Sequence, residues 1–539
     1  MSDAVVIGAG PNGLVAANLL ADAGWEVLVL EAADVPGGAV KSSELIEPGF
    51  TSDHFSAFYP LAAASPIIKG FELERFGLKW KTAPLVLAHP DLSGRCPVIS
   101  TDIETTAASL DEDSPGDGDA WRRLYSLWED IGADFIKALF TPFPPIAAPL
   151  RIAATLGPRE LARFARFITL PVRRLADETF TGPSGGMLLA GNALHSDLAP
   201  ESVMSGFYGW FLCCLGQQFG FPVPERGAGS LIDALVARLE SKGGSVECGQ
   251  AVSRIVVEGG RAVGVTTRTG DSFGARRAVL ADVGAPQLYL DLIGEEHLPS
   301  RVIDDIKKFQ YDNGTVKIDW ALSGPIPWTA PPARRAGTVH VAESMDALTE
   351  LAAQLHMGQI PAKPFLVVGQ MTVADETRSP AGTESAWAYA HVPQNAKGDA
   401  LGEISGKWDE RDTEIFTDRM EAEIEKLAPG FQELIIGRYV MNPLTLEEKN
   451  ANLVGGAVNG GTAQLHQSLI FRPTSGLARP GTPIKDLYLA SASAHPGGGV
   501  HGAPGANAAK AALWREKRKK LILPVAGAAV AAGLLRRGR

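Results

Sequence analysis

Residues 3–32, DAVVIGAGPNGLVAANLLADAGWEVLVLEA, decide the fold of this chain. An apolar run, a glycine-rich turn, a helix-forming stretch and a second apolar run follow one another, which predicts strand, turn, helix and strand. The turn reads Gly8-x-Gly10-x-x-Gly13: the first glycine permits a tight turn, the second lets a pyrophosphate approach the backbone, and the third lets helix and strand pack closely. The helix that begins here directs free N–H groups at the phosphates. We therefore expect a Rossmann-type nucleotide-binding unit.

Glu31 ends the second predicted strand, where an acidic side chain binds the ribose hydroxyls of a dinucleotide. A carboxylate at this position disfavours a 2′-phosphate and therefore NADP. A glycine-rich turn alone would be weak support for a dinucleotide site. Here the predicted strand, helix, second strand and acid also follow in the expected order and spacing. We find one nucleotide motif of this kind and no CxxC redox pair. One tightly bound dinucleotide, without dependence on NAD(P)H, is the expectation.

Composition sets the broad class of the protein. The chain has 539 residues, 45% hydrophobic and 21% charged, which predicts an ordinary globular protein of two or three domains. A net charge of −11 argues against a nucleic-acid partner. Four cysteines without metal-ligand spacing predict no metal site and fit a reducing cytoplasm. We expect no signal peptide before the apolar run at Ala4 and no membrane-spanning stretch in the interior.

A glycine pair, Gly37 and Gly38, follows Glu31 in the stretch PGGAV. Together with the glycine-rich turn, these residues resemble the flavoprotein superfamily of phytoene desaturases, amine oxidases and Rab escort proteins, in which the pair approaches the FAD diphosphate. Many members carry arginine directly after the pair, where this chain has Ala39. That departure weakens the likeness to amine oxidases and leaves the resemblance to FAD proteins intact.

Two stretches near the end of the chain narrow the resemblance. SLIFRPTSG (468–476) and GTPIKDLYLASASAHPGGGVHGAPGANAA (481–509) resemble the phytoene-desaturase-like branch, in which the HPGGG segment lies against the flavin ring. Two residues differ from that branch: Ala506 stands where many relatives have arginine, and His466 where they have aspartate. The resemblance implies FAD as the cofactor.

The resemblance also implies that both ends of the chain contact FAD. The residues expected to bind it are Gly8, Ala9, Gly10, Pro11, Asn12, Gly13, Glu31, Ala32, Gly37, Gly38, Ala39, Val252, Gly497, Gly498, Gly499 and Val500. The three consecutive glycines would pass beneath the isoalloxazine ring, where a Cβ would strike the flavin or its substrate. A helix with Pro504 in its first turn would point its positive end at the ring. Val252 follows a predicted helix at 229–242 and would contact the adenine or pyrophosphate through its backbone; a strand meander without ligand contact is the alternative.

We expect an α/β fold with two parts. A discontinuous Rossmann-type FAD-binding domain takes residues 1–94, 225–290 and 479–514, and an α+β substrate domain with an antiparallel sheet and a helical cap takes 95–224 and 291–478. In the substrate domain, GTVKIDWAL, PFLVVGQMTV and SAWAYAHVP predict neighbouring antiparallel strands.

Two features of the predicted substrate domain each allow two interpretations. Its aromatic residues Trp320, Trp387 and Tyr389 would line a pocket or belong to the core. In the oily segment around 133–180, Arg159, Arg163 and Arg166 alternate with apolar residues, so cations and apolar groups take different helix faces. Such a helix lies on an anionic membrane beside an entrance for a lipid, or packs on the core.

A flavin joined to an oily substrate domain predicts hydride removal from an unactivated or allylic carbon. His495 and His501 are the candidate catalytic residues, because a pKa near 6.5 lets either move a proton at neutral pH; hydrogen bonding within the glycine loop is their alternative role. No metal-ligand cluster or Walker loop is present, which argues against metal-dependent hydrolases and phosphotransferases.

Three functions remain open at this point. The first is an FAD-dependent desaturase or dehydrogenase acting on a long apolar substrate such as an isoprenoid, a polyene or an acyl chain. The second is a flavin-dependent polyene or fatty-acid isomerase without net oxidation, and the third a non-enzymatic lipid-binding escort. An amine oxidase is a weaker fourth, because no residue that would clamp its substrate can be identified. The oligomeric state and the electron acceptor, oxygen or a quinone, stay open.

The segment 515–539 forms a basic and apolar C-terminal tail, REKRKKLILPVAGAAVAAGLLRRGR. Five cations precede an apolar run of fifteen residues, 521–535, which as a helix would span roughly 22 Å, against about 30 Å of hydrocarbon in a bilayer. A basic cluster beside a weakly apolar segment predicts peripheral contact with an anionic membrane without crossing it. A disordered tail, or one that docks on another protein chain, is the alternative.

Overall fold

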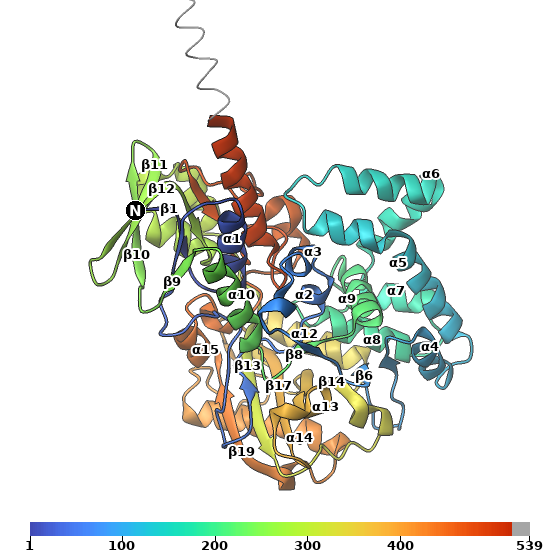
Figure 1. Ribbon diagram of the computed structural model, residues 1–539. Coiled ribbons are helices and arrows are strands. Elements are labelled where there is room, and N and C mark those ends of the chain that lie inside the picture. Colours follow the sequence, from blue (N-terminus) through green and yellow to red (C-terminus); the bar gives the residue numbers. More distant parts are fainter. Residues whose placement is uncertain (520–539) are drawn as a thin grey trace, which may run out of the picture.

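Two β-sheets organise the part of the chain that the computed structural model describes, residues 1–519 (Figure 1). Within these residues each sheet has seven strands, and a lobe of helices lies beside them. In Figure 1 the first sheet brings together segments from the beginning, the middle and the end of the chain, as expected for a discontinuous nucleotide-binding domain.

The first sheet has a parallel centre. Its strands are β1 (Ser2–Ile7), β2 (Val27–Leu30), β9 (Ser245–Glu247), β10 (Val252–Glu258), β11 (Arg261–Thr267), β12 (Ser272–Ala281) and β20 (Leu487–Leu489), in the order β10-β11-β12-β1-β2-β9, with β20 paired to β12. β1 pairs in parallel with both β2 and β12. β1 and β2 are almost entirely buried, which explains why their sequences are continuous apolar runs. The α/β Rossmann-type prediction is confirmed.

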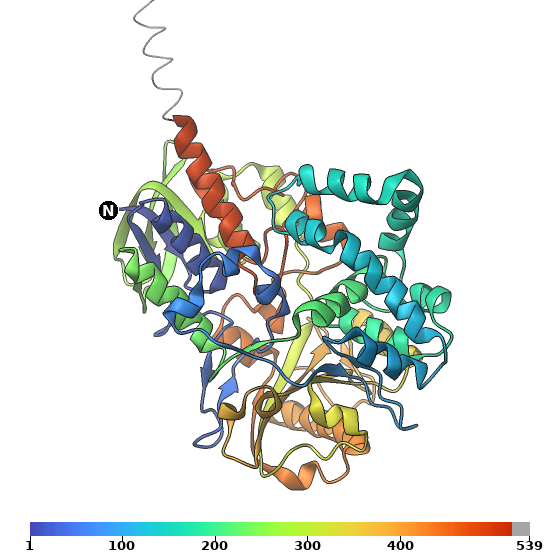
Figure 2. The ribbon, with the colours of Figure 1, turned by 45° about the vertical axis from the view of Figure 1, so that its right-hand side comes forward.

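Helix α1 (Pro11–Asp22) joins β1 to β2, and a C-terminal helix over 503–519 lies against it (Figures 1 and 2). A Cβ added at Gly505 would stand 1.9 Å from the carbonyl oxygen of Asn12. A Cβ at Gly502 would stand 2.6 Å from a methyl group of Val15. These glycines let the two helices approach to backbone contact, so the two ends of the described chain meet at the start of α1.

The second sheet is antiparallel except for one pair of strands. Its strands are β6 (Leu85–Ala88), β7 (Val98–Ile99), β13 (Gly314–Leu322), β14 (Ala336–Val341), β16 (Leu366–Gln370), β17 (Glu384–Val392) and β19 (Ile435–Met441), in the order β19-β13-β17-β16-β14-β6-β7. The three strands predicted from the sequence are neighbours here, but the end of the second one forms α13 (Met371–Ala374) instead. β6 pairs in parallel with β14, although it lies inside the segment 1–94 that we assigned to the FAD-binding domain.

The aromatic residues of the second sheet divide between its two faces. Trp320 is fully buried, packs its ring edge-on against Phe431 at 5.3 Å and donates its indole N–H to Glu421, so it belongs to the core. Trp387 and Tyr389 stack on the opposite face, with ring centroids 6.1 Å apart and planes 12° from parallel. That face belongs to the largest apolar cluster, which also contains residues of α8 (Ser184–Ala193) and α9 (Ser205–Phe219).

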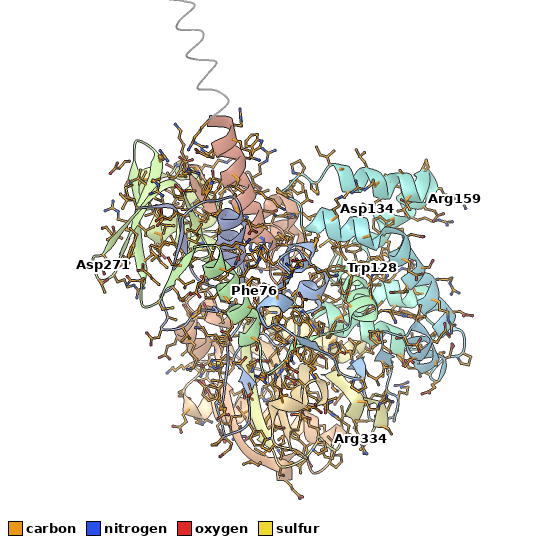
Figure 3. The ribbon with its side chains drawn as sticks, viewed as in Figure 1. Phe76, Trp128, Asp134, Arg159, Asp271 and Arg334 are labelled. Atoms are coloured by element: carbon orange, nitrogen blue, oxygen red, sulfur yellow. The ribbon has the colours of Figure 1, made fainter. Side chains whose placement is uncertain are left out.

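The helical lobe contains α5 (Asp117–Leu139) and α6 (Ala147–Thr169), the latter interrupted at Gly157, whose φ is +70°. Trp128 of α5 packs edge-on against Trp210 at 5.8 Å, whereas Arg159 lies at the outer end of the lobe (Figure 3). Phe164 is buried in the same apolar cluster, so the second half of α6 packs one face on the core.

The remaining helices and short strands connect these parts. The helices are α2 (Pro60–Ala64), α3 (Pro66–Lys69), α4 (Ile103–Asp111), α7 (Val172–Thr179), α8 (Ser184–Ala193), α9 (Ser205–Phe219), α10 (Gly229–Ser241), α11 (Ser300–Ile306), α12 (Met345–His356), α14 (Glu410–Leu427) and α15 (Pro443–Lys449). The short strands are β3 (Ser42–Ser43), β4 (Ser52–Asp53), β5 (Trp80–Lys81), β8 (Val223–Pro224), β15 (Gln359–Ile360) and β18 (Gly398–Asp399). The helix predicted at 229–242 is confirmed as α10.

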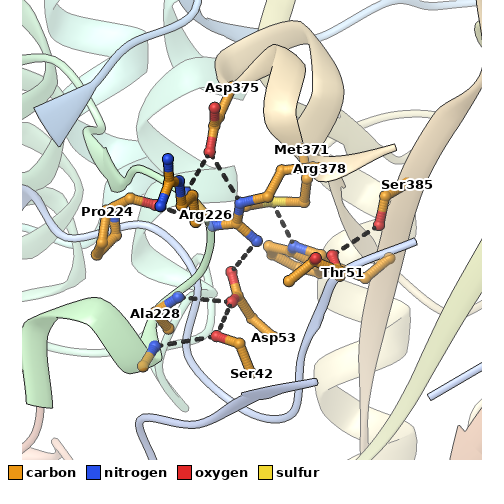
Figure 4. Close-up of polar contacts among 12 residues, drawn as sticks. Ser42, Thr51, Asp53, Pro224, Arg226, Ala228, Met371, Asp375, Arg378 and Ser385 are labelled. Carbon is orange, nitrogen blue, oxygen red and sulfur yellow. Dashed lines mark hydrogen bonds and ion pairs between the residues drawn. The ribbon is translucent and has the colours of Figure 1, made fainter. Parts of the chain in front are cut away.

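A buried ion-pair network joins the two sheets' domains (Figure 4). Arg378, whose side chain is fully buried, donates to Asp53 at 3.0 Å and to Asp375 at 3.1 Å. Asp53 also accepts from the backbone N–H of Ala228 at 2.8 Å, and Asp375 from that of Arg226 at 2.8 Å. Because every charge here has a partner, the network fixes the segments that cross between the domains.

Among residues 1–519, no helix combines the length and the apolar character needed to cross a bilayer. The described part of the predicted tail, 515–519, continues the helix that lies on α1. Residues 520–539, which include the apolar run, lie outside the described part of the chain.

Candidate cofactor site

A cavity of about 390 Å³ opens beside the carboxyl ends of β1, β2 and β12. Of the predicted FAD-binding residues, nine line it: Gly8, Gly10, Pro11, Asn12, Glu31, Ala32, Gly38, Ala39 and Val252. Asp282, Gly460 and the segment 491–493 line it as well. Ligands of open α/β sheets bind at this edge of the sheet.

The geometry explains why glycine is needed at each of the three positions of the turn. Gly8 has a φ of +92°, which other residues rarely adopt. A Cβ at Gly13 would stand 2.1 Å from the carbonyl oxygen of Gly8, so the helix could not pack on the turn. A Cβ at Gly10 would stand 2.8 Å from the Asp282 carboxylate, on the cavity side. The roles predicted for the first and third glycines agree with this geometry.

The glycine pair lies against the turn. Gly37 donates its N–H to the carbonyl of Ala9 at 3.0 Å and has a φ of +130°. A Cβ at Gly38 would stand 3.1 Å from the Cα of Gly10. The two glycine segments therefore approach backbone to backbone, which the sequence did not predict.

Glu31 holds two backbone segments at the far end of the cavity. Its carboxylate accepts from the N–H of Ala9 at 2.7 Å and from that of Ala33 at 3.0 Å. A carboxylate has about four acceptor positions, so capacity remains for ribose hydroxyls. Gln250, whose buried Oε1 has no hydrogen-bond partner among the described residues, also lines the cavity near this end.

A loop over 458–463 borders the other end of the cavity, and long-range side chains hold it. Asp312 accepts from the N–H groups of Val458, Asn459 and Gly461, each within 3.1 Å. Burial raises the pKa of Asp312 to about 6. Asp197 accepts from the hydroxyl of Thr462 and holds the next part of the loop.

Arg472, buried to 2% exposure, completes this support. Its guanidinium donates to four backbone carbonyls, those of Asn459, Gly461, Thr462 and Ala492. It thereby ties the loop over 458–463 to the segment 491–493, and both line the cavity. Arg472 lies in SLIFRPTSG, but nothing in that stretch reveals its role; Asp312 and Asp197 stand far away in the sequence.

The HPGGG loop, residues 495–499, lies next to this support and does not line the cavity. A Cβ at Gly498 would stand 2.7 Å from the carbonyl oxygen of Asn459, and one at Gly499 would stand 2.6 Å from a methyl group of Leu61. Gly497 faces the guanidinium of Arg472. These glycines thus have close protein neighbours, and their contact with the flavin ring stays a prediction, as does that of Val500.

The two candidate histidines differ in their contacts. His501 Nδ1 accepts from the N–H of Ala503 at 3.1 Å, and its Nε2 lies 3.3 Å from the carbonyl oxygen of Gly498, so this ring fastens the loop. His495 packs edge-on against Phe143 at 5.8 Å, and neither of its ring nitrogens has a hydrogen-bond partner among the described residues. Burial lowers the pKa of each to about 4, so both are neutral near pH 7. A catalytic role for either stays a prediction.

The cavity fits an elongated dinucleotide such as FAD. Glu31 and the unpaired oxygen of Gln250 mark the adenosine end, and the glycine turn the place of the diphosphate. Asn12, at the start of α1, also has a buried Oδ1 without a partner in the described part of the chain. Backbone groups and polar side chains at 491–493 and 458–460 mark the opposite end. Among residues 1–519 no group of histidine, cysteine and acidic side chains is arranged to hold a metal ion.

Comparisons with known proteins agree with a nucleotide-binding fold and a flavin cofactor. Residues 6–69 match the NAD(P)-binding Rossmann-like domain, and residues 99–320 match the family of flavin-containing amine oxidoreductases. Solved structures share the fold: a redesigned putrescine oxidase has a TM-score of 0.60 at 16% identity over 96% of this chain and 99% of its own. An oxidoreductase from Methanosarcina mazei has a TM-score of 0.59 at 16% identity over 95% and 99%.

Relatives with curated names match nearly the whole chain. The pyridine nucleotide-disulfide oxidoreductase domain-containing protein 2 of Rattus norvegicus is 28% identical, over 94% of this chain and 92% of its own. A limonene dehydrogenase chain of Castellaniella defragrans is 23% identical over 94% of both chains, and a lycopene-forming phytoene desaturase of Pseudescherichia vulneris 23% over 96% and 99%. The cavity, the two domain matches and these relatives together identify the chain as an FAD-dependent oxidoreductase, similar over nearly its whole length to phytoene-desaturase-like proteins.

Proposed function

We propose that the protein is a dehydrogenase of the desaturase type, which removes hydride from a carbon of a long apolar substrate such as an isoprenoid, a polyene or an acyl chain. The observation that carries this proposal is the apolar cluster between the second sheet and helices α5, α8 and α9, which reaches the start of the C-terminal helix just after the HPGGG loop. Ala503, a few residues after that loop, belongs to the cluster. A hydrocarbon is the substrate class that such a wall accepts without leaving polar groups unpaired.

Aromatic and aliphatic side chains form the wall between the sheet and the loop. Trp387 stacks on Tyr389, and Phe58 lies against Trp387 with ring centroids 6.0 Å apart. On the side of the loop, Leu61 faces Gly499, and the ring of Phe140 lies 5.0 Å from that of His501. Apolar groups thus lie both on the sheet and beside the HPGGG loop.

The carboxylates close to this wall already have partners. Asp319 accepts from the buried Lys317, whose ammonium lies 5.8 Å from the ring of Trp387, and Asp53 pairs with Arg378. An ammonium substrate would need a carboxylate or an open aromatic cage there. This favours a hydrocarbon over an amine. The relatives named for phytoene desaturation and limonene dehydrogenation support the same class of substrate.

Bound FAD would supply the hydride acceptor for this reaction. A desaturation removes two hydrogens, so a proton must leave together with the hydride. His495 is neutral near pH 7 and its ring nitrogens have no partner among the described residues, so the nitrogen that carries no hydrogen can accept that proton. The apolar wall orients the chain of the substrate and excludes water, while Arg472 and Asp312 keep the loop in place.

Anaerobic mixing of the FAD-loaded protein with isoprenoid hydrocarbons in vesicles tests the proposal. We expect bleaching of the flavin absorption and a product two hydrogens lighter by mass spectrometry. A product of unchanged mass would indicate an isomerase, and a bound lipid without bleaching an escort. Bleaching by simple amines and by no hydrocarbon would overturn the proposal.

We also propose that the protein contacts an anionic membrane through its C-terminal tail and α6. Ile146 and Leu150, one helical turn apart at the start of α6, are 67% and 65% exposed, and Trp514 is 60% exposed. Figures 1 and 2 both show α6 and the end of the C-terminal helix at the same end of the molecule. Apolar side chains beside a basic segment are typical of peripheral membrane proteins.

A further inference from the structure

Asp282 occupies the place where the cofactor's diphosphate is expected. It directly follows β12, and its Oδ2 accepts from the N–H of Gly13, in the first turn of α1, at 2.8 Å. It lines the cavity and is 8% exposed. A Cβ on Gly10 would stand 2.8 Å from the same oxygen. The carboxyl therefore lies against the glycine turn, inside the anion-binding end of α1.

Helix α1 has no acidic residue in its own first turn. Its N-cap is Gly10, which makes no side-chain capping bond. Asp282, 269 residues away in the sequence, supplies the acceptor instead. The free N–H groups and the positive end of the helix dipole attract an anion to this place, and the diphosphate of FAD is such an anion. An ionised Asp282 beside it would put two like charges in contact.

The charged groups around Asp282 do not neutralise it. Glu31, directly after β2, is the charged group that acts on the pKa of Asp282, and it has the same sign. Lys41, Arg268 and Lys449 line the cavity together with Glu448, but none of the cations forms an ion pair with Asp282. Burial, and to a lesser extent Glu31, raise the pKa of Asp282 to about 7, although the Gly13 N–H acts in the opposite direction.

We propose that Asp282 binds the FAD diphosphate as the neutral carboxylic acid, so that FAD binding takes up one proton. One carboxyl oxygen keeps accepting from the N–H of Gly13. The other carries the added proton and donates it in a hydrogen bond to a diphosphate oxygen, so no like charges meet. The proton comes from solvent, and no bond of FAD changes. This inference concerns cofactor binding and is independent of the substrate proposed above.

The sign of the pH dependence follows from linkage. Below about pH 7 the carboxyl of the FAD-free protein is already protonated, so FAD affinity is independent of pH. Above about pH 7, FAD binding must take a proton from solvent. The FAD affinity then falls as the pH rises, by up to about tenfold per pH unit. The diphosphate of FAD has no monoester proton to lose, so the ligand keeps its own charge over this range.

The test measures FAD binding to the FAD-free protein by calorimetry in buffers of different ionisation enthalpy, at about pH 8. We expect close to one proton taken up by the natural protein and none by Asp282→Asn, whose amide keeps an acceptor for Gly13 and a donor for the phosphate. The variant should bind FAD about tenfold more tightly at this pH, with a flat pH profile.

Glu384→Gln is the matched control. Glu384 is a buried carboxyl in the second sheet whose pKa burial raises to about 8, and it does not line the cavity. It titrates in the same range, so Glu384→Gln should still take up one proton on binding FAD. If the natural protein takes up no proton and binds FAD equally well at about pH 6 and about pH 8, the proposal is wrong whether or not Asp282→Asn folds. A folded Asp282→Asn protein that loses FAD would also overturn it, because the charge would then be required.

Discussion

The two ends of the cofactor cavity are built in different ways. At the N-terminal end, residues 8–13 and the pair Gly37–Gly38 meet backbone to backbone, and local glycines make that contact. At the C-terminal end, the loop over 458–463 and the segment 491–493 depend on Arg472 and on buried acids from other elements. The first end is therefore sensitive to any added side chain, and the second to the loss of one.

Gly13→Val should have the largest effect. Its Cβ would stand 2.1 Å from the carbonyl oxygen of Gly8, and neither backbone can move away without separating α1 from β1. We expect loss of bound FAD and of stable expression, measured as flavin absorbance per protein. Gly481→Val is the control, because a Cβ at Gly481 has no atom of the described residues within 4 Å. A Gly13→Val protein that retains FAD would show that the turn tolerates a side chain.

Arg472→Met should have the next largest effect and tests the other end. It removes the guanidinium that donates to four backbone carbonyls, and we expect a loss of about 3–5 kcal/mol in the free energy of unfolding. Thermal unfolding followed by tryptophan fluorescence measures it. Arg479→Met, an exposed position on the same segment, should be neutral. Equal unfolding temperatures for the two variants would mean that the loop does not depend on Arg472.

This contrast also explains how far the sequence could predict the site. The Rossmann unit, Gly8, Gly10, Gly13 and Glu31 follow local rules of spacing, and the structure places all but Gly13 on the cavity lining. Asp282 ends the stretch AVLAD (278–282), and an acid at the carboxyl end of a strand beside β1 is a signal that could have revealed it.

The C-terminal end was less predictable. Asp312 and Asp197 reach its loop across long sequence separations, and no spacing rule relates them to it. The resemblance predicts flavin contacts for the three glycines at 497–499, whereas the cavity lining includes 491–493. Trp320 and Trp387 alternate with their neighbours on adjacent strands of one sheet, so periodicity could not say which of them faces the core.

Glu31→Ala should have a moderate effect, confined to the N-terminal end. It removes the acceptor for the N–H groups of Ala9 and Ala33 and the predicted acceptor for ribose hydroxyls, and FAD binding should weaken by about 1.5–3 kcal/mol. Titration of FAD by fluorescence measures this. Glu44→Ala, at an exposed position, should bind FAD normally. Unchanged FAD affinity in Glu31→Ala would assign the carboxylate a purely structural role.

The smallest effect is a difference in how the two ends respond to acid in the FAD-free protein. At the C-terminal end, burial lowers the pKa of His501 to about 4, below its ordinary 6.5. The unfolded chain then binds the proton first, so this contribution to stability is full above about pH 6.5 and is lost as the pH falls toward 4. At the N-terminal end, burial raises the pKa of Asp282 to about 7. There the folded state binds the proton first, so acidification stabilises it.

Between about pH 7.5 and pH 5.5, the contributions of His501 and Asp282 to the free energy of unfolding each change by about 1–2 kcal/mol, with opposite sign. His501→Asn should therefore lose less stability on acidification than the natural protein, and Asp282→Asn should lose more. Thermal unfolding of the three proteins at both pH values measures the difference, and each variant is compared only with itself, so its own destabilisation cancels. Equal pH responses in all three would mean that neither side chain is held in the protonation state that its burial requires.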